Sequence, residues 1–366
     1  MMIRTPAPVE VPGSGFYALP VRVYARDPFF TSSAQAAEEK VLFDPAFADR
    51  QMVFIAEDHG QVRARCVARR SGVSGTGTIG FFEAFHDVAA CGQLLTAAED
   101  WLRSHGVRRV LGPMDGDTWH RYRFAVGSLR EAPFLKEPWN PVYYPELWEA
   151  CGYRVIDRYF SARIPDPEKA VANLMPYLRR IRRQGYTFRP IDKRRLKEEV
   201  GLMHRLSLQI FSGNRHYTAI GLESFLRLYE GIQSILVPGL CQFCCAPDGA
   251  EVGFVFGYPD YADAVRAMRG RHSWSAKLKF LWNRRGVERI CFKSLGCLPA
   301  YRGTSVGPAL MATALEQVVA GGYKEVLMCL MHEHNDSRRL DAGTSVPFRE
   351  YVLYEKCLSG GPDQHE

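Results

Sequence analysis

The two halves of the chain repeat the same order of predicted strands and helices, and this duplication constrains the fold more than any other feature. In the first half, apolar or alternating runs on either side of Asp58-His59-Gly60 predict a β-hairpin, because glycine tolerates the positive φ of such a turn. This half is predicted to form strands at 51–57, 61–69, 78–85, 109–111 and 154–163, and helices at 88–105 and 144–151. A hairpin followed by strand, helix and strand is typical of a mixed sheet covered by helices.

The second half follows the same order. It is predicted to form strands at 186–190, 234–246, 251–257, 289–298, 325–331 and 349–355, and helices at 193–210, 222–231 and 309–320. The sequence therefore predicts an α/β fold, with a mixed α+β sheet, built from two tandem domains that each have a central mixed sheet flanked by helices.

A segment with a different composition separates the two halves. Residues 165–184 contain three prolines and end in the basic cluster 179–183, which we interpret as a solvated helix face. We expect this segment to be a linker between an N-terminal domain at 1–164 and a C-terminal domain at 185–366.

The composition of the 366-residue chain is that of a globular protein. With 46% hydrophobic and 24% charged residues it can bury a substantial core, which excludes disordered, collagen-like and coiled-coil classes. The formal net charge of +7 is compatible with a polyanionic ligand but does not require one. No apolar run approaches the ~18 residues of a membrane span, and the start of the chain lacks the apolar stretch of a secretion signal. We therefore expect a cytoplasmic protein without a membrane partner.

The ten cysteines lack the spacing of a disulfide framework, which indicates reduced thiols. Cys241, Cys244 and Cys245 include a C-x-x-C pattern, yet no second pair and no histidine lies at zinc-finger distance. We interpret them as strand cysteines and expect no metal.

The strongest local signal is a glycine loop between the predicted strand at 289–298 and the predicted helix at 309–320. Gly303 and Gly307 let a ligand approach the backbone, and Arg302 adds positive charge. Backbone N–H groups and the positive end of the helix dipole form a site for a pyrophosphate at such a position. The loop lacks the Lys-Ser/Thr pair of a Walker motif and the Gly-x-Gly-x-x-Gly of a dinucleotide motif.

This loop resembles the acyl-CoA loop of the GNAT acyltransferase superfamily, whose pattern is Gln/Arg-x-x-Gly-x-Gly/Ala after a strand. Arg302, Ser305 and Gly307 take the three defined positions, Leu295–Pro299 takes the strand, and Asn335 has a place in the superfamily's last motif. Ser305 replaces the central glycine, which would weaken the loop if that position needed positive φ.

The resemblance extends over nearly the whole chain, which is similar to bacterial tandem two-domain GNAT proteins. In the first half it rests on Gly80–Glu83, Asp87, Ala89-Ala90, Trp101–Arg103, Gly106, Gly112-Pro113 and Asn140–Tyr153. At 85–90, where the phosphate loop of this half should lie, there is neither glycine nor arginine. We expect a degenerate domain without a CoA loop that scaffolds the second domain. The alternative is a separate site built from Glu83, His86, Asp115 and His120.

The resemblance implies that acetyl-CoA or another acyl-CoA binds in the second domain between two splayed parallel strands. The strand backbone would pair with the pantetheine amides, and one N–H would polarise the thioester carbonyl. The implied binding residues are Leu295, Gly296, Cys297, Leu298, Arg302, Gly303, Thr304, Ser305, Val306, Gly307 and Asn335. Because the amine attacks the thioester directly, we expect Cys297 to be a packing residue rather than an acyl carrier.

A general base is expected where the second splayed strand ends, at His332-Glu333-His334. Imidazole suits proton removal near neutrality. Alternation along a strand would place the two histidines on one face and Glu333 with Asn335 on the other. We favour the histidine face, with Glu333 as the alternative.

The superfamily's usual general acid, a tyrosine in the helix after this strand, has no counterpart in 336–343. Tyr354 or Tyr351 from the last strand, or water, would have to protonate the leaving thiolate.

Selection of the acceptor is expected from the loop between the first two helices of the second domain. Asn214, Arg215, His216 and Tyr217 lie in this loop, where Arg215 could bind a carboxylate, although all could equally be exposed loop residues. The basic, aromatic insert at 269–285 could dock an acidic carrier protein, but we favour an amphipathic surface helix there.

The sequence thus predicts an acyl-CoA-dependent N-acyltransferase that transfers an acetyl or longer acyl group to a small-molecule amine or amino acid. An acyl carrier protein is an alternative donor, and no nucleic-acid partner is expected. Two other functions stay open: a tandem GNAT-like transferase that uses aminoacyl-tRNA, and a non-catalytic acyl-CoA-binding module, which Ser305 and the missing tyrosine would favour.

Overall fold

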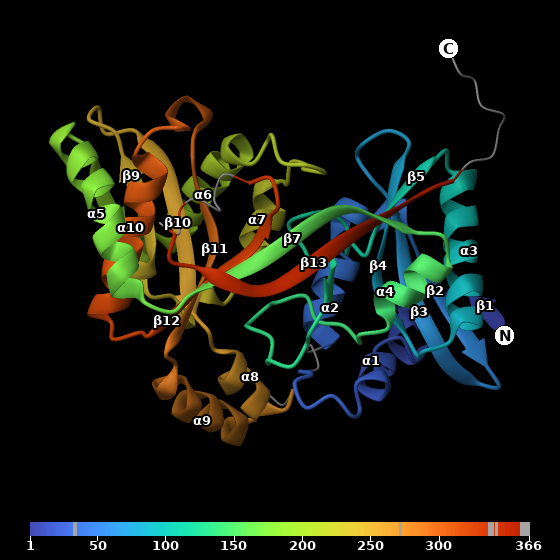
Figure 1. Ribbon diagram of the computed structural model, residues 1–366. Coiled ribbons are helices and arrows are strands. Elements are labelled where there is room, and N and C mark those ends of the chain that lie inside the picture. The colour runs from blue at the N-terminus through green and yellow to red at the C-terminus, as the bar shows by residue number, and fades with distance from the viewer. Residues whose placement is uncertain (32–34, 271–272, 336–339, 341–342, 359–366) are drawn as a thin grey trace, which may run out of the picture.

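A mixed sheet of thirteen strands extends through the whole molecule (Figure 1). The computed structural model describes residues 1–31, 35–270, 273–335, 340 and 343–358. The strands are β1 (Met2–Arg4), β2 (Gln51–Asp58), β3 (Gln61–Arg70), β4 (Thr76–Ala84), β5 (Arg109–Gly112), β6 (Phe124–Val126), β7 (Arg154–Ile164), β8 (Thr187–Pro190), β9 (Cys241–Cys245), β10 (Glu251–Pro259), β11 (Arg289–Cys297), β12 (Glu325–His332) and β13 (Val346–Cys357). They follow the order β1-β2-β3-β4-β5-β13-β7-β12-β11-β10-β9-β8, with β6 paired to β13. The predicted mixed sheet is confirmed.

The two halves of the sheet exchange strands at its centre. β7, from the first half of the sequence, pairs antiparallel with β12, where Tyr159 lies opposite His332. β13, the last strand, pairs with β5 and also runs antiparallel to β7. Figure 1 shows both strands crossing the middle of the molecule. The two predicted domains therefore share one sheet, and their limits at 1–164 and 185–366 stay a prediction.

Helices cover both faces of this sheet. They are α1 (Ala18–Val23), α2 (Gln35–Leu42), α3 (Val88–Ser104), α4 (Tyr144–Ala150), α5 (Pro167–Arg183), α6 (Leu196–Ile210), α7 (Leu222–Leu228), α8 (Ala262–Met268), α9 (Trp274–Asn283) and α10 (Val306–Ala320). In the first half, Phe54 and Cys66 belong to the core under α3, whereas Val53 and Val67 belong to the core on the opposite face. This is the alternation expected of strands covered on both sides.

The second half is layered in the same way. α5 and α10 lie side by side on one face (Figure 1), and α6 and α7 pack on the other. Val326 and Met328 of β12 belong to the core with α5 and α10, whereas Leu327 and Cys329 belong to the core with α6 and α7. None of the helices in the described residues is long and apolar enough to cross a membrane.

The segment expected to be a linker, 165–184, is largely helix α5. Its Pro167 lies in the first turn, where the missing N–H would have no helical partner. The buried face of α5 consists of Pro167, Ala170, Leu174, Leu178 and Ile181. The arginines of the cluster at 179–183 are exposed, as expected of a solvated helix face.

Several other boundaries differ from the prediction, and two of the differences have a clear physical reason. The strand expected to begin at 234 begins at Cys241, because residues 238–240 form a short 3-10 turn that starts with Pro238. The helix expected from 309 begins at Val306, because its first turn accommodates Pro308. All three cysteines of β9 are buried, as expected of strand cysteines.

Candidate active site

β11 and β12 pair as parallel strands over only four residues and then separate. The pairs run from Arg289 with Glu325 to Phe292 with Met328. Beyond them β11 stays paired with β10 as far as Cys297, and β12 is paired with β7 at its end. The facing edges of the two strands, 293–297 and 329–332, therefore diverge. We call this region the β11–β12 fork.

A β-bulge lies in β11 at the start of the fork. The register with β10 shifts between Phe292 and Ser294, so Lys293 is the extra residue of β11. Every residue from Lys293 to Leu298 is half-buried, although β11 lies inside the sheet. Burial, together with the nearby charge of Arg123, lowers the pKa of Lys293 to about 8.

The glycine loop joins β11 to α10 and leaves its backbone accessible. Gly303 has a φ of 72°, and a Cβ there would meet nothing within 4 Å. Ser305 has a φ of −79°, so the serine in place of the pattern's central glycine is not strained. A Cβ on Gly307 would meet Leu340 at 3.5 Å, an ordinary contact. Among the described residues, the backbone N–H groups of Ser305 and Gly307 have no hydrogen-bond partner.

Side-chain hydrogen bonds fix the shape of this loop. The Thr304 hydroxyl donates to the Tyr301 carbonyl at 2.6 Å and accepts the Val306 N–H at 3.2 Å. Arg302 Nη2 donates to the carbonyl of Ile210, at the end of α6, at 2.6 Å. Arg302 therefore ties the loop to α6.

The end of β11 packs against the same end of α6. A Cβ on Gly296 would meet Ile210 Cγ2 at 2.4 Å, so this close approach requires glycine. The neighbouring Cys297 is half-buried, and burial raises the pKa of its thiol. A protonated thiol agrees with the expectation that Cys297 is a packing residue rather than an acyl carrier.

Asp157 of β7 gathers three side chains near the end of β12. Its side chain is 2% exposed. The carboxylate accepts hydrogen bonds from His216 Nε2 at 2.6 Å and from His332 Nε2 at 3.0 Å, and it lies 2.8 Å from Arg215 Nε. Burial alone would raise the pKa of Asp157, but the two imidazole hydrogen bonds and the Arg215 charge hold it below its usual value. Because the carboxylate is ionised, both histidines present an Nε2–H to it.

The two histidines differ at their other ring nitrogen. His332 Nδ1 accepts the backbone N–H of His334 at 3.1 Å. For His216 Nδ1, the described part of the chain supplies no hydrogen-bond partner. His216 also has a φ of 57°, an uncommon conformation that aims its ring at Asp157. A neutral His216 therefore keeps a lone pair available for a proton.

β12 ends at His332, and the chain then turns. The Asn335 N–H donates to the His332 carbonyl at 2.9 Å, and the Glu333 N–H donates to the Arg158 carbonyl at 3.1 Å. The expected alternation of faces along 332–335 is therefore wrong, because the strand does not continue past His332. Most of the following segment, 336–343, lies outside the described residues.

A buried chain of hydrogen bonds holds a bulge of β12 inside the fork. Leu330 has a φ of 59°, and its N–H donates to Ser161 Oγ at 3.0 Å. The Ser161 hydroxyl lies 3.0 Å from that of Tyr351, which donates to Glu137. The Leu330 carbonyl accepts Arg123 Nη1 at 3.0 Å. The Tyr351 hydroxyl is thus committed to this network.

Tyr354 lies in the other half of the molecule, because β13 crosses to β5. Its hydroxyl donates to Glu149 at 2.8 Å, and its ring lies 6.2 Å from that of Phe124 and 6.1 Å from that of Trp148. The structure does not bring this expected general acid to the β11–β12 fork.

The α6–α7 loop divides between two environments. Arg215 and His216 reach Asp157, whereas Asn214 is exposed and its carbonyl accepts the Tyr217 N–H at 3.2 Å. The half-buried Tyr217 places its ring 5.8 Å from that of Trp119. The loop thus joins the site through two of its four predicted residues.

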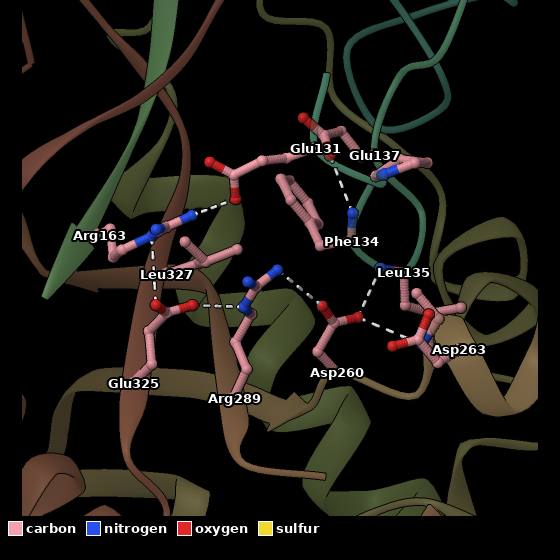
Figure 2. A network of polar contacts seen from close by, with 12 residues as sticks. Glu131, Phe134, Leu135, Glu137, Arg163, Asp260, Asp263, Arg289, Glu325 and Leu327 are labelled. Atoms are coloured by element: carbon pink, nitrogen blue, oxygen red, sulfur yellow. Dashed lines mark hydrogen bonds and ion pairs between the residues drawn. The ribbon is translucent and has the colours of Figure 1, made fainter. Parts of the chain in front are cut away.

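Ion pairs join the strands at the opposite end of β11 and β12 (Figure 2). Arg289 Nε lies 2.5 Å from Glu325 Oε1, and Arg163 Nε of β7 lies 3.2 Å from Glu325 Oε2. Arg289 is also 3.6 Å from Asp260. These contacts tie β7, β12 and β11 together where the strands are still paired.

The first half has a different connection at the corresponding place. Between β4 and α3, the Asp87 carboxylate accepts the Ala90 N–H at 2.9 Å. A carboxylate at this helix N-terminus would repel a pyrophosphate.

The four residues of the alternative first-half site are not brought together. Glu83 and Asp115 both contact Arg121, at 3.6 and 3.0 Å. The ring of His86 instead stacks on Tyr143, and the imidazole of His120 bonds Asp117 at 2.8 Å.

Comparison with known proteins concerns the fold. No protein-family model matches the chain. A tandem GNAT protein from the clavulanic acid biosynthesis pathway matches with a TM-score of 0.56 and 11% identity, over 99% of both chains. The chain has a tandem GNAT fold. The resemblance predicted from the glycine loop is thus confirmed for the fold.

Two further proteins that are similar to this chain carry acyltransferase names. A conserved protein from Enterococcus faecalis V583, titled a probable N-acyltransferase, matches with a TM-score of 0.57 and 9% identity over 98% of this chain and 72% of its own. The bacterial ceramide synthase of Caulobacter vibrioides is 23% identical to this chain over an alignment 384 residues long. The alignment covers 97% of this chain and 96% of the synthase.

The sequence alone did not single out Asp157 or Lys293. Asp157 stands in a predicted strand between Ile156 and Arg158, and the available signal was a single acid in that strand. Lys293 likewise interrupts an apolar strand. Both depend on pairings that only the folded sheet provides.

Proposed function

We propose that this tandem GNAT protein is an acyltransferase that moves an acyl group from acyl-CoA to a primary amine. The observation that carries the proposal is the fork between β11 and β12, which opens between the accessible glycine loop on one strand and Asp157 with its two histidines beside the other. A donor and a proton acceptor can meet there.

The glycine loop is the proposed pyrophosphate site. The N–H groups of Ser305 and Gly307 and the positive end of α10 supply donors, and the open space at Gly303 admits the ligand. The β12-facing edge of β11 would pair with the pantetheine amides as an added strand does. This arrangement uses the predicted residues 295–298 and 302–307. That Asn335 contacts the acyl-CoA donor stays a prediction.

His216 is the proposed general base, oriented by Asp157. The amine nitrogen attacks the thioester carbonyl carbon, a C–N bond forms and the C–S bond breaks. The ammonium proton passes to His216 Nδ1, the CoA thiolate leaves and takes a proton from water, and the imidazolium of His216 then returns its proton to the resulting hydroxide. This assignment differs from the expectation of His332, whose Nδ1 accepts the His334 N–H.

The proposed acceptor is a long-chain amine. The full-length relative named a ceramide synthase supports this choice, because a ceramide is an N-acylated long-chain amino alcohol. Half-buried apolar residues on the α6–α7 face also suit an aliphatic chain; they include Trp119, Phe211, Leu298 and Leu330. A small amine or amino acid remains the alternative acceptor. A cytoplasmic location and an acyl carrier protein donor stay predictions.

The test is product formation measured by mass spectrometry. The purified protein is incubated with acetyl-CoA or palmitoyl-CoA and with a sphingoid base or an amino acid. We expect an N-acyl sphingoid base and its loss in Gly307→Glu, which places bulk and negative charge at the pyrophosphate site. Gly92→Glu, at a position with nothing within 4 Å of a Cβ, is the matched control and should keep activity. Absence of every N-acyl product with all donors would contradict the proposal.

A further inference from the structure

Helix α9 presents an apolar face to solvent. Four large side chains on it are exposed, namely Trp274 at 81%, Leu278 at 64%, Leu281 at 44% and Trp282 at 74%. Figure 1 shows α8 and α9 extending away from the sheet. So many exposed apolar side chains on one short helix are unusual for a protein surface.

This face is not the side by which α9 attaches to the protein. Ala276 is buried, and the ring of Phe280 lies 5.7 Å from that of Tyr261. At 3.6 residues per turn, the four exposed apolar residues occupy about 100° of arc on the side opposite Ala276. α9 is thus apolar on two sides, and the four apolar side chains on its outer side are 44–81% exposed.

The stretch of sequence that contains this helix is basic. Between Asp263 and Glu288 there is no acidic residue, and the basic residues there are Arg266, Arg269, Arg271, Lys277, Lys279, Arg284 and Arg285. Their formal charge equals the net charge of +7 of the whole chain, so the remainder is formally neutral. Arg266 is paired with Asp263, and Lys277, Lys279, Arg284 and Arg285 lie in or directly after α9, next to its exposed apolar side chains in the sequence.

We propose that α9 docks the protein on the surface of an anionic phospholipid bilayer. Indole rings favour the boundary between headgroups and acyl chains, and Lys and Arg beside them attract anionic headgroups. The Lys277 ammonium lies 5.3 Å from the centre of the Trp274 ring, and the Arg285 guanidinium lies 6.0 Å from the centre of the Trp282 ring. Each indole therefore has a cation beside it.

The geometry favours a helix lying in the plane of the interface. A helix of ten residues is about 15 Å long, about half the thickness of the hydrocarbon core. An acidic carrier protein would be attracted by the cations but would not require an apolar face with two exposed tryptophans. Docking departs from the expectation of no membrane partner, which rested on the lack of a spanning segment.

The test is co-sedimentation with vesicles of phosphatidylcholine alone or with about a third phosphatidylglycerol. The wild-type protein should bind the anionic vesicles, lose binding as salt rises, and bind neutral vesicles weakly. The double variant Trp274→Ser, Trp282→Ser should bind at least about tenfold more weakly. Val9→Ser with Val142→Ser, which are 87% and 69% exposed elsewhere, should leave binding unchanged.

Three results would overturn the docking proposal. One is equal binding of neutral and anionic vesicles, and another is unchanged binding by the tryptophan double variant when circular dichroism shows it folded. The third has two parts. The wild-type protein does not bind vesicles but forms a dimer or a complex with an acidic carrier protein, and the tryptophan double variant does not form that dimer or complex. None of these outcomes depends on acyl transfer, so the docking proposal and the proposed function are tested separately.

Discussion

Among single side chains, Asp157 links the two halves of the chain chemically. It belongs to β7 of the first half, yet its hydrogen-bond partners are His332 of β12 and His216 of the α6–α7 loop. The first half therefore supplies part of the candidate active site of the second, a role beyond scaffolding.

Replacing His216 by Gln should lower kcat by ~10²–10⁴ and leave acyl-CoA affinity nearly unchanged, because the amine loses its proton acceptor but the glycine loop is intact. His332→Gln is the matched comparison and should cost less, since the Nδ1 of His332 already accepts the His334 N–H. Steady-state kinetics with calorimetric acyl-CoA titration would check both. The reverse ranking would favour His332, the base expected from the sequence.

Lys293 should make stability depend on pH. Its folded pKa of about 8 is below the ordinary 10.5, so the unfolded chain binds the proton more tightly. The free energy of unfolding of the wild type should therefore rise between pH 8 and 10.5. Lys293→Met removes the cost of burying a charged ammonium. The variant should therefore be more stable than the wild type at neutral pH by about 1–2 kcal/mol, after allowance for partial solvent screening.

Urea unfolding across that pH range measures the effect of Lys293. The advantage of Lys293→Met should shrink as the pH approaches 10.5. Lys197→Met, at an exposed position of α6, serves as control. A pH-independent difference between wild type and Lys293→Met would show that packing, rather than protonation, separates them.

Among strands and helices, local signals were predictive and long-range pairing was not. The helix expected at 88–105 is α3, since its apolar spacing is complete within the segment. α5 also has helical spacing, but its prolines suggested a break, although Pro167 lies harmlessly in the first turn. The glycine loop was likewise predictable because its motif is continuous in sequence. Asp157 and its partners come from three separate segments, which only strand exchange brings together.

The ion pairs at the closed end of the fork should contribute to stability. Glu325→Gln leaves Arg289 and Arg163 without their shared carboxylate and should lower the free energy of unfolding by about 1–2 kcal/mol. Glu316→Gln removes a carboxylate that lies 3.8 Å from the half-exposed Arg182 and should cost almost nothing. Urea denaturation of both variants compares them directly, and equal losses would contradict a clamping role for Glu325.

Across the molecule, the exchange of β7 and β13 makes the halves mutually dependent. β7 is hydrogen-bonded to β12, and β13 is hydrogen-bonded to β5. Neither half can therefore unfold without breaking the strand pairs that it shares with the other half. We expect one cooperative unfolding transition, with tryptophan fluorescence and far-ultraviolet circular dichroism changing together. Two separated transitions would show that the domains predicted at 1–164 and 185–366 are independent.

The central claim is that the fork and the glycine loop of the second half bind acyl-CoA while the first half does not. Native mass spectrometry with palmitoyl-CoA counts the bound molecules directly. The account predicts one acyl-CoA per chain, none on Gly307→Glu, and one on the control Gly92→Glu. Two molecules per chain, or one that persists on Gly307→Glu, would contradict it.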